Sequence, residues 1–528
     1  MIRRMLNLLM LISIAVPLGL STRSVADETI EHARQPEHVP PSIELLFMTV
    51  DLPSRFELQI ELDGVPIRDI WETIFARLFE FFDRDANGSL DETEVTRLPS
   101  PFAIRQILWG RFALDSGSNP PLHQLDSNAN HSVSKEELSA YYRQSGLGDL
   151  LIGVGKTSTT EALNDALISS VDLNQDGFAD EFEWQSAVDL IERRDSNDDE
   201  QIGPGELVTR SAYPGAVGSI FLRPPVPGEA PNPVVAALPF ILLPRESLAP
   251  KLIVDLLNAS NSTNRRIDSH QIVAMLESPP ESSCRIQAKT TTEGIQFAYP
   301  STEFSVPPNG PRIAPAGPVR LAMRCDQGKL AAQSVTARKQ FEALFAEFDT
   351  DSNGTLSPQE LSAPRARALG QIAKVADCDH NGSISRTEFS TWLDLMDQIA
   401  RGHLLLTIID HGCGLFELID QNHDGALSRR ELRAAADRLR TADCFRDGRL
   451  NRNALPHHLL AVVSHGHPQS PLGRPDRQGP AWFQAMDRNG DGDLSRREFT
   501  GPTEIFQKFD LNRDGYVDHQ EADPDGRK

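Results

Sequence analysis

Apolar residues recur with a helical period in several stretches of the chain. In "WETIFARLFEFFD", Trp71, Ile74, Phe75, Leu78 and Phe82 fall on one face of a helix. The segments "FEALFAEFD", "HGCGLFELID" and "TEIFQKFD" repeat this arrangement, and each of them ends at an aspartate. The pattern predicts amphipathic helices that bury an apolar face and stop at an acidic residue.

Other stretches alternate between apolar and polar residues. Residues 284–325 contain "CRIQAKT", "IQFAYP", "TEFSVPP" and "VRLAMRC", and residues 43–62 contain "IELLFMTV" and "FELQIEL". Alternation of this kind predicts short strands. Residues 214–250 are rich in proline, which is typical of an extended linker.

Acidic twelve-residue segments follow the predicted helices. In "DRNGDGDLSRRE", the oxygen-bearing residues Asp487, Asn489 and Asp491 occupy positions 1, 3 and 5, Gly492 is sixth and Glu498 is twelfth. Calcium takes six to eight oxygen ligands at about 2.3–2.6 Å, and a glutamate can supply two of them. The seventh residue adds a backbone carbonyl, while glycine at position six accepts a positive φ. The segment therefore predicts a calcium-binding loop.

Nine segments carry these oxygen ligands, and each is named below by the number of its first residue. Loops 83, 172, 349, 377, 420, 487 and 510 match the whole pattern. Loops 126 and 195 keep the oxygen ligands but have His131 and Glu200 in place of the sixth-position glycine. Loop 443 has Phe445 at position three and Ala454 at position twelve, so we interpret it as a silent loop. A fainter relic at 260–271 lacks acids at positions one and twelve, and we expect no ion there.

The predicted metal ligands occupy positions 1, 3, 5, 7 and 12 of the nine loops. In the first half of the chain they are Asp83, Asp85, Asn87, Ser89, Glu94, Asp126, Asn128, Asn130, Ser132, Glu137, Asp172, Asn174, Asp176, Phe178, Glu183, Asp195, Asn197, Asp199, Gln201 and Glu206. In the second half they are Asp349, Asp351, Asn353, Thr355, Glu360, Asp377, Asp379, Asn381, Ser383, Glu388, Asp420, Asn422, Asp424, Ala426, Glu431, Asp487, Asn489, Asp491, Asp493, Glu498, Asp510, Asn512, Asp514, Tyr516 and Glu521.

Position eight provides an independent test, because the ligand pattern does not specify it. All ten loops, the silent one included, have an apolar residue there: Leu90, Val133, Ala179, Ile202, Leu356, Ile384, Leu427, Leu450, Leu494 and Val517. Acidic surface loops that join helices without binding metal would show no such column. The apolar residue is expected to pack on a neighbouring loop.

These loops resemble the EF-hand family position by position. The chain looks like a secreted bacterial multi-EF-hand protein, with loops spread over residues 70–525. The resemblance implies binding of Ca²⁺, about seven to nine ions if the nine ligand-bearing loops fill. It implies a mainly α fold of tandem helix–loop–helix units in two halves, around a small strand- and proline-rich middle segment. The 23-residue step from loop 172 to loop 195 leaves room for one shared helix at "WQSAVDLIERR".

The patterns divide the chain into six predicted segments. They are a signal peptide (1–26), a strand-like segment (27–66), a first EF-hand region with four loops (67–210), a proline-rich linker with a degenerate hand (211–282), a small strand-rich module (283–335), and a second EF-hand region with six loops, one of them silent (336–528).

The N-terminal residues predict export. Arg3 and Arg4 precede a mostly apolar run from Met5 to Leu20, and small residues at 24–26 offer a cleavage site before Asp27. A membrane anchor is the alternative, although the run is short for a span. We expect a protein that is secreted or held in the periplasm or cell envelope, without a transmembrane span after cleavage.

Charge and cysteine content refine this picture. The formal charge is −23, and it becomes −26 without the three arginines of the signal segment, so nucleic acid is not expected as a partner. Nine Ca²⁺ ions would add 18 charges and leave −8. Among five cysteines, Cys284 and Cys325 are the expected disulfide in an exported protein.

Other candidate sites are weak. The segment "PHHLLAVVSHGH" carries His457, His458, His465 and His467, and a solvated loop is favoured over a transition-metal site. Residues 150–163 look like a phosphate-binding loop but have Leu150 where that motif needs glycine. We therefore expect a non-enzymatic calcium-binding protein with structural or buffering ions. One alternative is a calcium-dependent adhesion or scaffold protein with an envelope or extracellular partner. Another is an enzyme with an unrecognised site in 214–345.

Overall fold

The structure is a computed structural model. It describes residues 42–47, 54–113, 119–148, 150–214, 216–222, 240–243, 269–280, 282–291, 294–298, 312–316, 319–470, 472 and 479–523. Contacts divide the chain into residues 1–40 and 41–528, and every described residue lies in the second unit. The predicted signal peptide, the relic loop at 260–268 and most of the proline-rich linker therefore fall outside the described residues.

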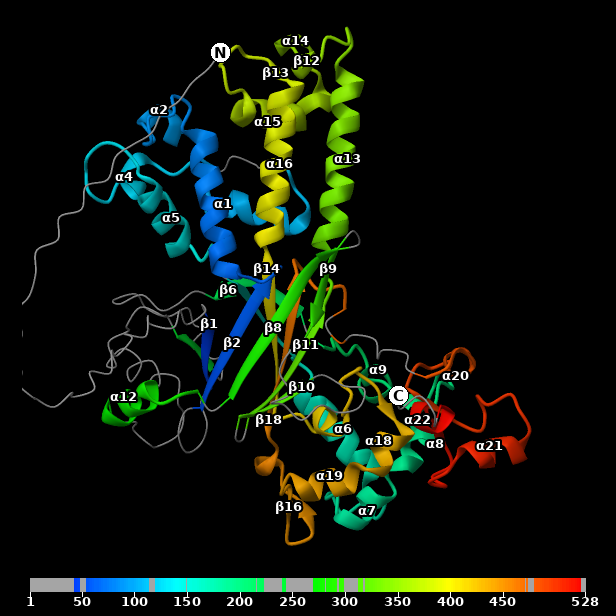
Figure 1. Cartoon of the computed structure of the whole chain (residues 1–528). Coiled ribbons are helices and arrows are strands. Elements are labelled where there is room, and N and C mark those ends of the chain that lie inside the picture. Colours follow the sequence, from blue (N-terminus) through cyan, green and yellow to red (C-terminus); the bar gives the residue numbers. More distant parts are fainter. Residues whose placement is uncertain are drawn as a thin grey trace, which may run out of the picture. The chain divides into compact units, whose positions relative to one another are not determined.

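A six-stranded mixed sheet joins distant parts of the chain (Figure 1). Its strands, in spatial order, are β10 (Arg312–Ala316), β11 (Val319–Asp326), β18 (His457–His465), β14 (Leu404–Gly412), β4 (Leu151–Lys156) and β6 (Ala216–Leu222). β14 is parallel to β4 and antiparallel to β18, which is parallel to β11. Nearly every residue of β14 and β18 is buried, so their apolar runs are continuous rather than alternating.

A second sheet contains four of the six strands expected from alternation, while "VRLAMRC" forms β11 of the central sheet and "TEFSVPP" lies outside the described residues. Its order is β7 (Phe240–Leu243), β1 (Ser42–Phe47), β2 (Ser54–Leu62), β8 (Ser282–Thr291) and β9 (Gly294–Ala298), and β3 (Val65–Pro66) also pairs with β2. Burial alternates along most of β2, as expected for a strand with one face on a core. Two six-stranded sheets are more than a small middle segment, so the predicted mainly α fold is only partly correct.

Long helices pack against one another in the first helical group. Its members are α1 (Ile67–Phe82), α2 (Glu92–Val95), α3 (Pro101–Arg105), α4 (Leu122–Leu125), α5 (Lys135–Gln144), α13 (Leu330–Phe348), α14 (Pro358–Leu361), α15 (Arg367–Ala376) and α16 (Arg386–Gly402). The predicted apolar face of α1 is buried, and its Trp71 Nε1 donates to Gly402 O at 2.9 Å. A Cβ at Gly402 would lie 2.5 Å from Ile74 Cδ1, so glycine permits this close contact between α1 and α16.

The second helical group forms a separate core. It contains α6 (Thr160–Val171), α7 (Glu181–Gln185), α8 (Leu190–Arg194), α9 (Pro204–Leu207), α17 (Leu415–Ile419), α18 (Arg429–Arg433) and α19 (Ala435–Thr441). The segment expected to form one shared helix is instead α7, a 3-10 turn (Ala187–Asp189) and α8. A third, small core belongs to α20 (Ala481–Met486), α21 (Thr503–Phe509) and α22 (His519–Ala522). Outside these groups, α12 spans Ser269–Glu277.

Two further expectations concern the membrane and the cysteines. Within the described residues, no helix combines the length and apolarity that a bilayer span requires. All five cysteines are described and none forms a disulfide, so the predicted Cys284–Cys325 bond is not present. Cys284 lies on β8 of one sheet, whereas Cys325 lies on β11 of the other.

Candidate metal centres

Each calcium-type loop begins where an incoming helix ends. The Asp83 amide donates to Phe79 O at 2.9 Å and closes the last turn of α1, so the Asp83 side chain is placed at the mouth of the loop. The same backbone bond fixes the first aspartate of seven more loops: Asp126, Asp172, Asp349, Asp377, Asp420, Asp487 and Asp510.

The first aspartate of every ligand-bearing loop accepts a hydrogen bond from the backbone amide of the residue at position six. In all nine loops the amide of the sixth residue donates to Oδ2 of the first, over 2.9–3.3 Å. In loop 420, for example, the Gly425 amide donates to Asp420 Oδ2 at 3.0 Å. The backbone thus fixes Oδ2 of this aspartate, and the orientation of Oδ1 follows because both oxygens belong to one carboxylate.

The glutamate at position twelve is held from both sides of the loop. Its Oε1 accepts the amide of position two at 2.6–3.0 Å in all nine loops. Its Oε2 accepts the amide of position nine at 2.8–3.0 Å, also in all nine. The second bond is half of a capping box at the N-terminus of the exit helix. The carboxylate therefore spans the loop in the position that bidentate binding requires.

Loops without the sixth-position glycine adopt the same backbone. His131 has φ 65° and Glu200 has φ 63°, close to the 82° of Gly177 at the equivalent place. A non-glycine residue there costs about 1–2 kcal/mol, which the loop's other bonds offset. Loop 443 is different. All its residues are described, and neither the sixth-residue bond to Asp443 nor a glutamate bridge is formed.

Short β-bridges between position-eight residues show which loops pair. Loops 83 and 126 pair through Leu90 and Val133. Loops 349 and 377 pair through β12 (Thr355–Leu356) and β13 (Ile384–Ser385), and loops 487 and 510 through β19 (Asp493–Leu494) and β20 (Val517–Asp518). These three pairs join neighbours in sequence.

The other four loops pair across the chain. β5 (Gln201–Ile202) of loop 195 pairs with β15 (Leu427–Ser428) of loop 420. Loop 172 pairs with the silent loop 443, where the Leu450 amide donates to Ala179 O at 3.0 Å. Within loop 443, β16 (Phe445–Arg446) and β17 (Arg449–Leu450) form a hairpin. Each partner is therefore more than 220 residues away, and the two halves of the chain complete one another's hands.

The loops fit a hard cation. In loops 83, 349 and 377, three carboxylates have one oxygen each within 4.8 Å of the others: Asp83, Asp85 and Glu94; Asp349, Asp351 and Glu360; Asp377, Asp379 and Glu388. Asp377 Oδ1 and Asp420 Oδ1 are buried and have no hydrogen-bond partner. Buried oxygens without a donor are stabilised by a cation. Ca²⁺ bound there would supply the positive charge that these oxygens lack.

Burial separates the loops into two kinds. In loops 126 and 349, backbone donation from Ser134 and Ser357 lowers the pKa of Glu137 and Glu360 to about 2. In loop 420, Asp420 is fully buried, and burial together with neighbouring acids raises its pKa well above the usual range. Burial likewise raises the pKa of Glu431 to about 7. Loop 487 is similar, since burial raises the pKa values of Asp491, Asp493 and Glu498.

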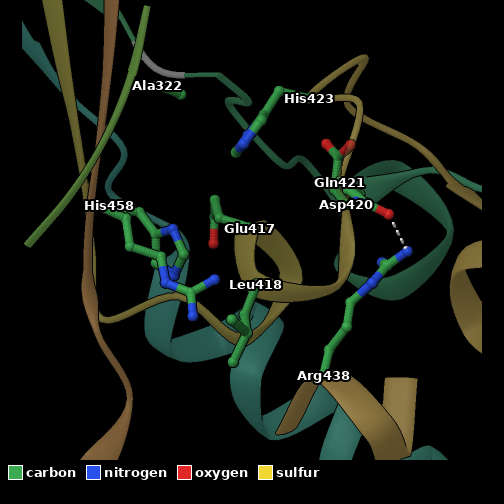
Figure 2. A pocket seen from close by; sticks show the side chains of 9 residues that line it. Ala322, Glu417, Leu418, Asp420, Gln421, His423, Arg438 and His458 are labelled. Carbon is green, nitrogen blue, oxygen red and sulfur yellow. Dashed lines mark hydrogen bonds between the residues drawn. The ribbon is translucent and has the colours of Figure 1, made fainter. Parts of the chain in front are cut away.

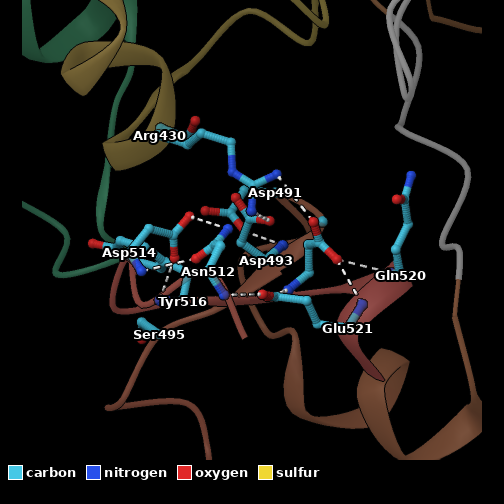
Figure 3. Close-up of polar contacts among 12 residues, drawn as sticks. Arg430, Asp491, Asp493, Ser495, Asn512, Asp514, Tyr516, Gln520 and Glu521 are labelled. Atoms are coloured by element: carbon cyan, nitrogen blue, oxygen red, sulfur yellow. Dashed lines mark hydrogen bonds and ion pairs between the residues drawn. The ribbon is translucent and has the colours of Figure 1, made fainter. Parts of the chain in front are cut away.

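Contacts between hands involve residues that the ligand pattern does not identify. Arg430, at the start of α18, forms an ion pair with Asp493 of loop 487 at 2.6 Å (Figure 3). Asn489 of loop 487 donates through Nδ2 to Asp199 O of loop 195 at 2.9 Å. Ligand residues of different loops are thus joined directly.

The histidine-rich segment is not a solvated loop. It forms β18, in which His458 and His465 are buried, while His457 Nε2 lies 2.6 Å from Asp410 Oδ1 of β14. A strand buried on both faces shows no alternation, and this is why the pattern alone did not reveal it.

Comparison with known proteins supports the loop assignment. The family model described as "EF hand" matches residues 341–363, 414–435, 481–500 and 503–521, which contain loops 349, 420, 487 and 510. No solved structure matches the chain.

Three curated relatives are calcium-dependent protein kinases. The chain is 25% identical over 173 residues to calcium-dependent protein kinase 19 of Oryza sativa subsp. japonica, covering 29% of this chain and 30% of the relative. It is 27% identical to kinase 2 of Zea mays, covering 22% of each chain. It is also 27% identical to kinase 33 of Arabidopsis thaliana, covering 25% of this chain and 27% of the relative.

These relatives correct one expectation. The prediction that the protein is not an enzyme is contradicted, because the similar proteins are named as kinases. The chain spans less than a third of their length, so the kinase activity is a statement about the relatives. With the matched hands and the loop geometry, the findings support a calcium-binding protein with multiple EF hands.

Proposed function

We propose that this chain is an exported calcium-ion-binding protein with multiple EF hands, in which the ions are mainly structural. The observation that carries the proposal is the shared geometry of nine loops. In each of them the first aspartate is bound by the sixth amide and the twelfth glutamate bridges positions two and nine. This arrangement leaves carboxylate oxygens directed at one point, where a hard cation is the suitable ligand.

Burial of several ligands supports a structural role. Asp420 is fully buried, and Asp487 and Asp493 are 3% and 4% exposed. An unpaired buried charge typically destabilises a protein by about 3–5 kcal/mol. Asp420 Oδ1 has no hydrogen-bond partner, so this hand needs either an ion or a proton to remain packed, whereas a sensor must be folded without calcium.

Native mass spectrometry of the full chain tests the proposal. At millimolar Ca²⁺ we expect seven to nine bound ions, with loop 443 empty. A plateau below five ions would contradict it. A structural role also predicts that removal of calcium raises the binding of a dye to exposed apolar surface. A rise in dye binding on addition of calcium, with the apo protein folded, would instead indicate a sensor.

Export is supported by the pattern of residues 1–26, where Arg3 and Arg4 precede an apolar run. Expression in a host with a secretion pathway and N-terminal sequencing of the exported chain test this part of the proposal. We expect the exported chain to begin at Asp27. A chain that stays inside the cell and retains Met1 would contradict it.

A further inference from the structure

A cavity lined by several charged and polar residues lies where the central sheet meets loop 420. Its volume is about 140 Å³, well above the minimum that one water molecule needs. β11 contributes Arg320, β18 contributes His458, α17 contributes Glu417, and loop 420 contributes Asp420 and His423. Among the five predicted ligands of loop 420, Asp420 alone lines the cavity.

Two nitrogen-bearing side chains face this cavity without partners. Arg320 and His458 are directly opposite one another on the parallel strands β11 and β18, so their side chains leave the sheet on the same side. His458 is 3% exposed, and its Nε2 has no hydrogen-bond partner. Within the described residues, the half-buried Arg320 guanidinium forms neither a hydrogen bond nor an ion pair. A buried polar nitrogen without a partner is costly unless a ligand satisfies it.

Among the other polar groups of the wall, Arg438 is already engaged, whereas Glu417 Oε1 and Asp420 Oδ1 have no hydrogen-bond partner. Arg438 donates to Gln421 Oε1 at 2.6 Å, which is the dashed line in Figure 2. Arg438 also donates to Ile419 O. Glu417 Oε1 lies 3.4 Å from His411 Nδ1, outside the group of residues that line the cavity. In Figure 2 the His423 and His458 rings are directed toward the same space as Glu417. Arg438 is therefore used within the wall, whereas the nitrogens of Arg320, His423 and His458 remain available to a ligand.

We propose that this cavity binds a small oxyanion, with Arg320 as a two-pronged donor and His458 Nε2 as a further donor. A guanidinium has the planar geometry that matches the paired oxygens of a carboxylate, sulfate or phosphate group. These groups share the chemistry that the wall recognises, and the volume limits the ligand to a small molecule.

Binding of the oxyanion is linked to calcium, and this part rests on the proposed function. Without calcium, the ionised form of Asp420 in the wall repels an anion. Ca²⁺ at loop 420 offsets that charge and adds its own positive field. Linkage is reciprocal, so the anion also strengthens calcium binding at loop 420.

Isothermal titration calorimetry of the full chain tests the proposal, with sulfate and acetate as separate probes. Bound calcium is first stripped with EGTA, the chelator is removed by gel filtration, and half of the sample is reloaded with Ca²⁺. We expect saturable binding of at least one probe to the loaded protein, and binding at least threefold weaker in the stripped protein. Sulfate binding would indicate a tetrahedral oxyanion, and acetate binding a carboxylate.

Two variants assign the binding to the cavity. Arg320→Gln should weaken binding at least tenfold, whereas Arg365→Gln, which removes a guanidinium that is 78% exposed on its side chain, should leave it unchanged. Ala322→Val fills the cavity without a change in charge and should also weaken binding. Circular dichroism and calcium stoichiometry confirm that each variant is folded.

Several results would overturn the proposal. One is the absence of saturable binding of either probe. Another is equal binding by the wild type and by the folded Arg320→Gln and Ala322→Val variants. A third is stoichiometric Zn²⁺ binding that depends on His458 but not on Arg320. Normal calcium stoichiometry without oxyanion binding would remove this inference alone. Calcium stoichiometry below five with intact oxyanion binding would remove the proposed function and the linkage, but not the site.

Discussion

Loop 349 and loop 420 have the same acids at positions one and twelve but lie in different surroundings. Loop 349 is solvent-facing, and backbone amides stabilise the charge of its Glu360, whose pKa falls to about 2. Loop 420 lies between α17 and α18 with Asp420 fully buried, and burial raises the pKa of its Glu431 to about 7. One motif thus provides two kinds of site. In one the glutamate is ionised without calcium, and in the other ionised carboxylates are unstable until calcium binds.

Ligand spacing determines the geometry of a loop but not the free energy of its ionised carboxylates. Both loops form the bond from the sixth amide to Oδ2 of the first aspartate, at 3.0 Å in each. Desolvation is supplied by residues far away in sequence, such as β5 of loop 195, which pairs with loop 420. The dependence on calcium should therefore differ between hands that look alike.

The largest expected effect is that of calcium removal on local stability. Bare carboxylates in loops 420 and 487 should destabilise their hands by about 3–5 kcal/mol, a change of roughly a hundredfold or more in amide exchange. Loop 349 should change much less, because its acids remain hydrated. Hydrogen exchange with mass spectrometry at pH 7.5, with and without Ca²⁺, measures this. Equal loss of protection in both groups would show that burial does not divide the loops.

A change of pH should act in opposite directions on the two kinds of loop in the calcium-free protein. Glu431 keeps its proton up to about pH 7 when folded but only to about 4.5 when unfolded, so its contribution to stability is lost as pH rises through 7. The effect is on the order of 3 kcal/mol. Glu360 contributes stability above its unfolded pKa, and this is lost as pH falls toward 2.

Exchange profiles of the calcium-free chain between pH 5 and pH 8, corrected for intrinsic exchange, measure this difference. Residues 415–441 should lose protection with rising pH, while residues 349–361 should not. Loading with Ca²⁺ serves as the control, because it should abolish the trend in residues 415–441. A parallel response of the two segments would contradict the assignment of pKa values to burial.

A double-mutant cycle should detect the pairing of distant loops. Ile202 and Leu427 are both fully buried and face one another across β5 and β15. Ile202→Val and Leu427→Ala should couple by about 0.5–3 kcal/mol in urea unfolding, as residues in contact do. The matched control is Ile202→Val with Leu356→Ala, where Leu356 belongs to the pair of loops 349 and 377. Coupling of equal size in the control would remove the evidence for contact.

The smallest expected effect concerns the bond between loops 487 and 195. Asn489→Asp keeps an oxygen ligand for loop 487 but removes the amide that donates to Asp199 O, and it should weaken calcium binding at loop 195 by about 0.5–1.5 kcal/mol. Asn512→Asp is the control, since the Asn512 amide donates within its own loop to Asp514. Calcium-dependent exchange of residues 195–206 reads out the site. If the calcium concentration at half-maximal protection of residues 195–206 is unchanged in Asn489→Asp, the bond does not affect calcium binding at loop 195.

The loops could be predicted from the sequence because their geometry is local. Asp83 and Glu94 are placed by bonds within twelve residues, so spacing alone identifies them. The sheet could not be identified in this way, since β14 and β18 are buried along nearly their whole length and lack the alternation that identified β2.

Loop spacing did contain an indirect signal for the missed strands. The steps from loop 126 to 172, from 377 to 420 and from 443 to 487 are 43–46 residues, and each contains one strand of the central sheet: β4, β14 or β18. The step from loop 83 to loop 126 is also 43 residues but contains no strand among its described residues, so a long step shows room for a strand and not its presence. The 23-residue steps contain none. Pairing of loop 195 with loop 420 had no signal at all, because contacts between residues more than 220 apart depend on the completed fold.

The silent loop 443 determines how its partner responds to calcium. Its Arg449 lies over the Phe178 ring at 4.2 Å and reaches Asp176 of loop 172 at 3.5 Å, so loop 172 pairs with a surface that holds a fixed positive charge and needs no ion. In a pair of two binding loops, occupation of one assists the other. Loop 172 has no such neighbour across its bridge, and its occupancy should rise hyperbolically with calcium, with a Hill coefficient of one. The chain would then contain one hand that binds calcium without cooperativity among hands that bind it cooperatively.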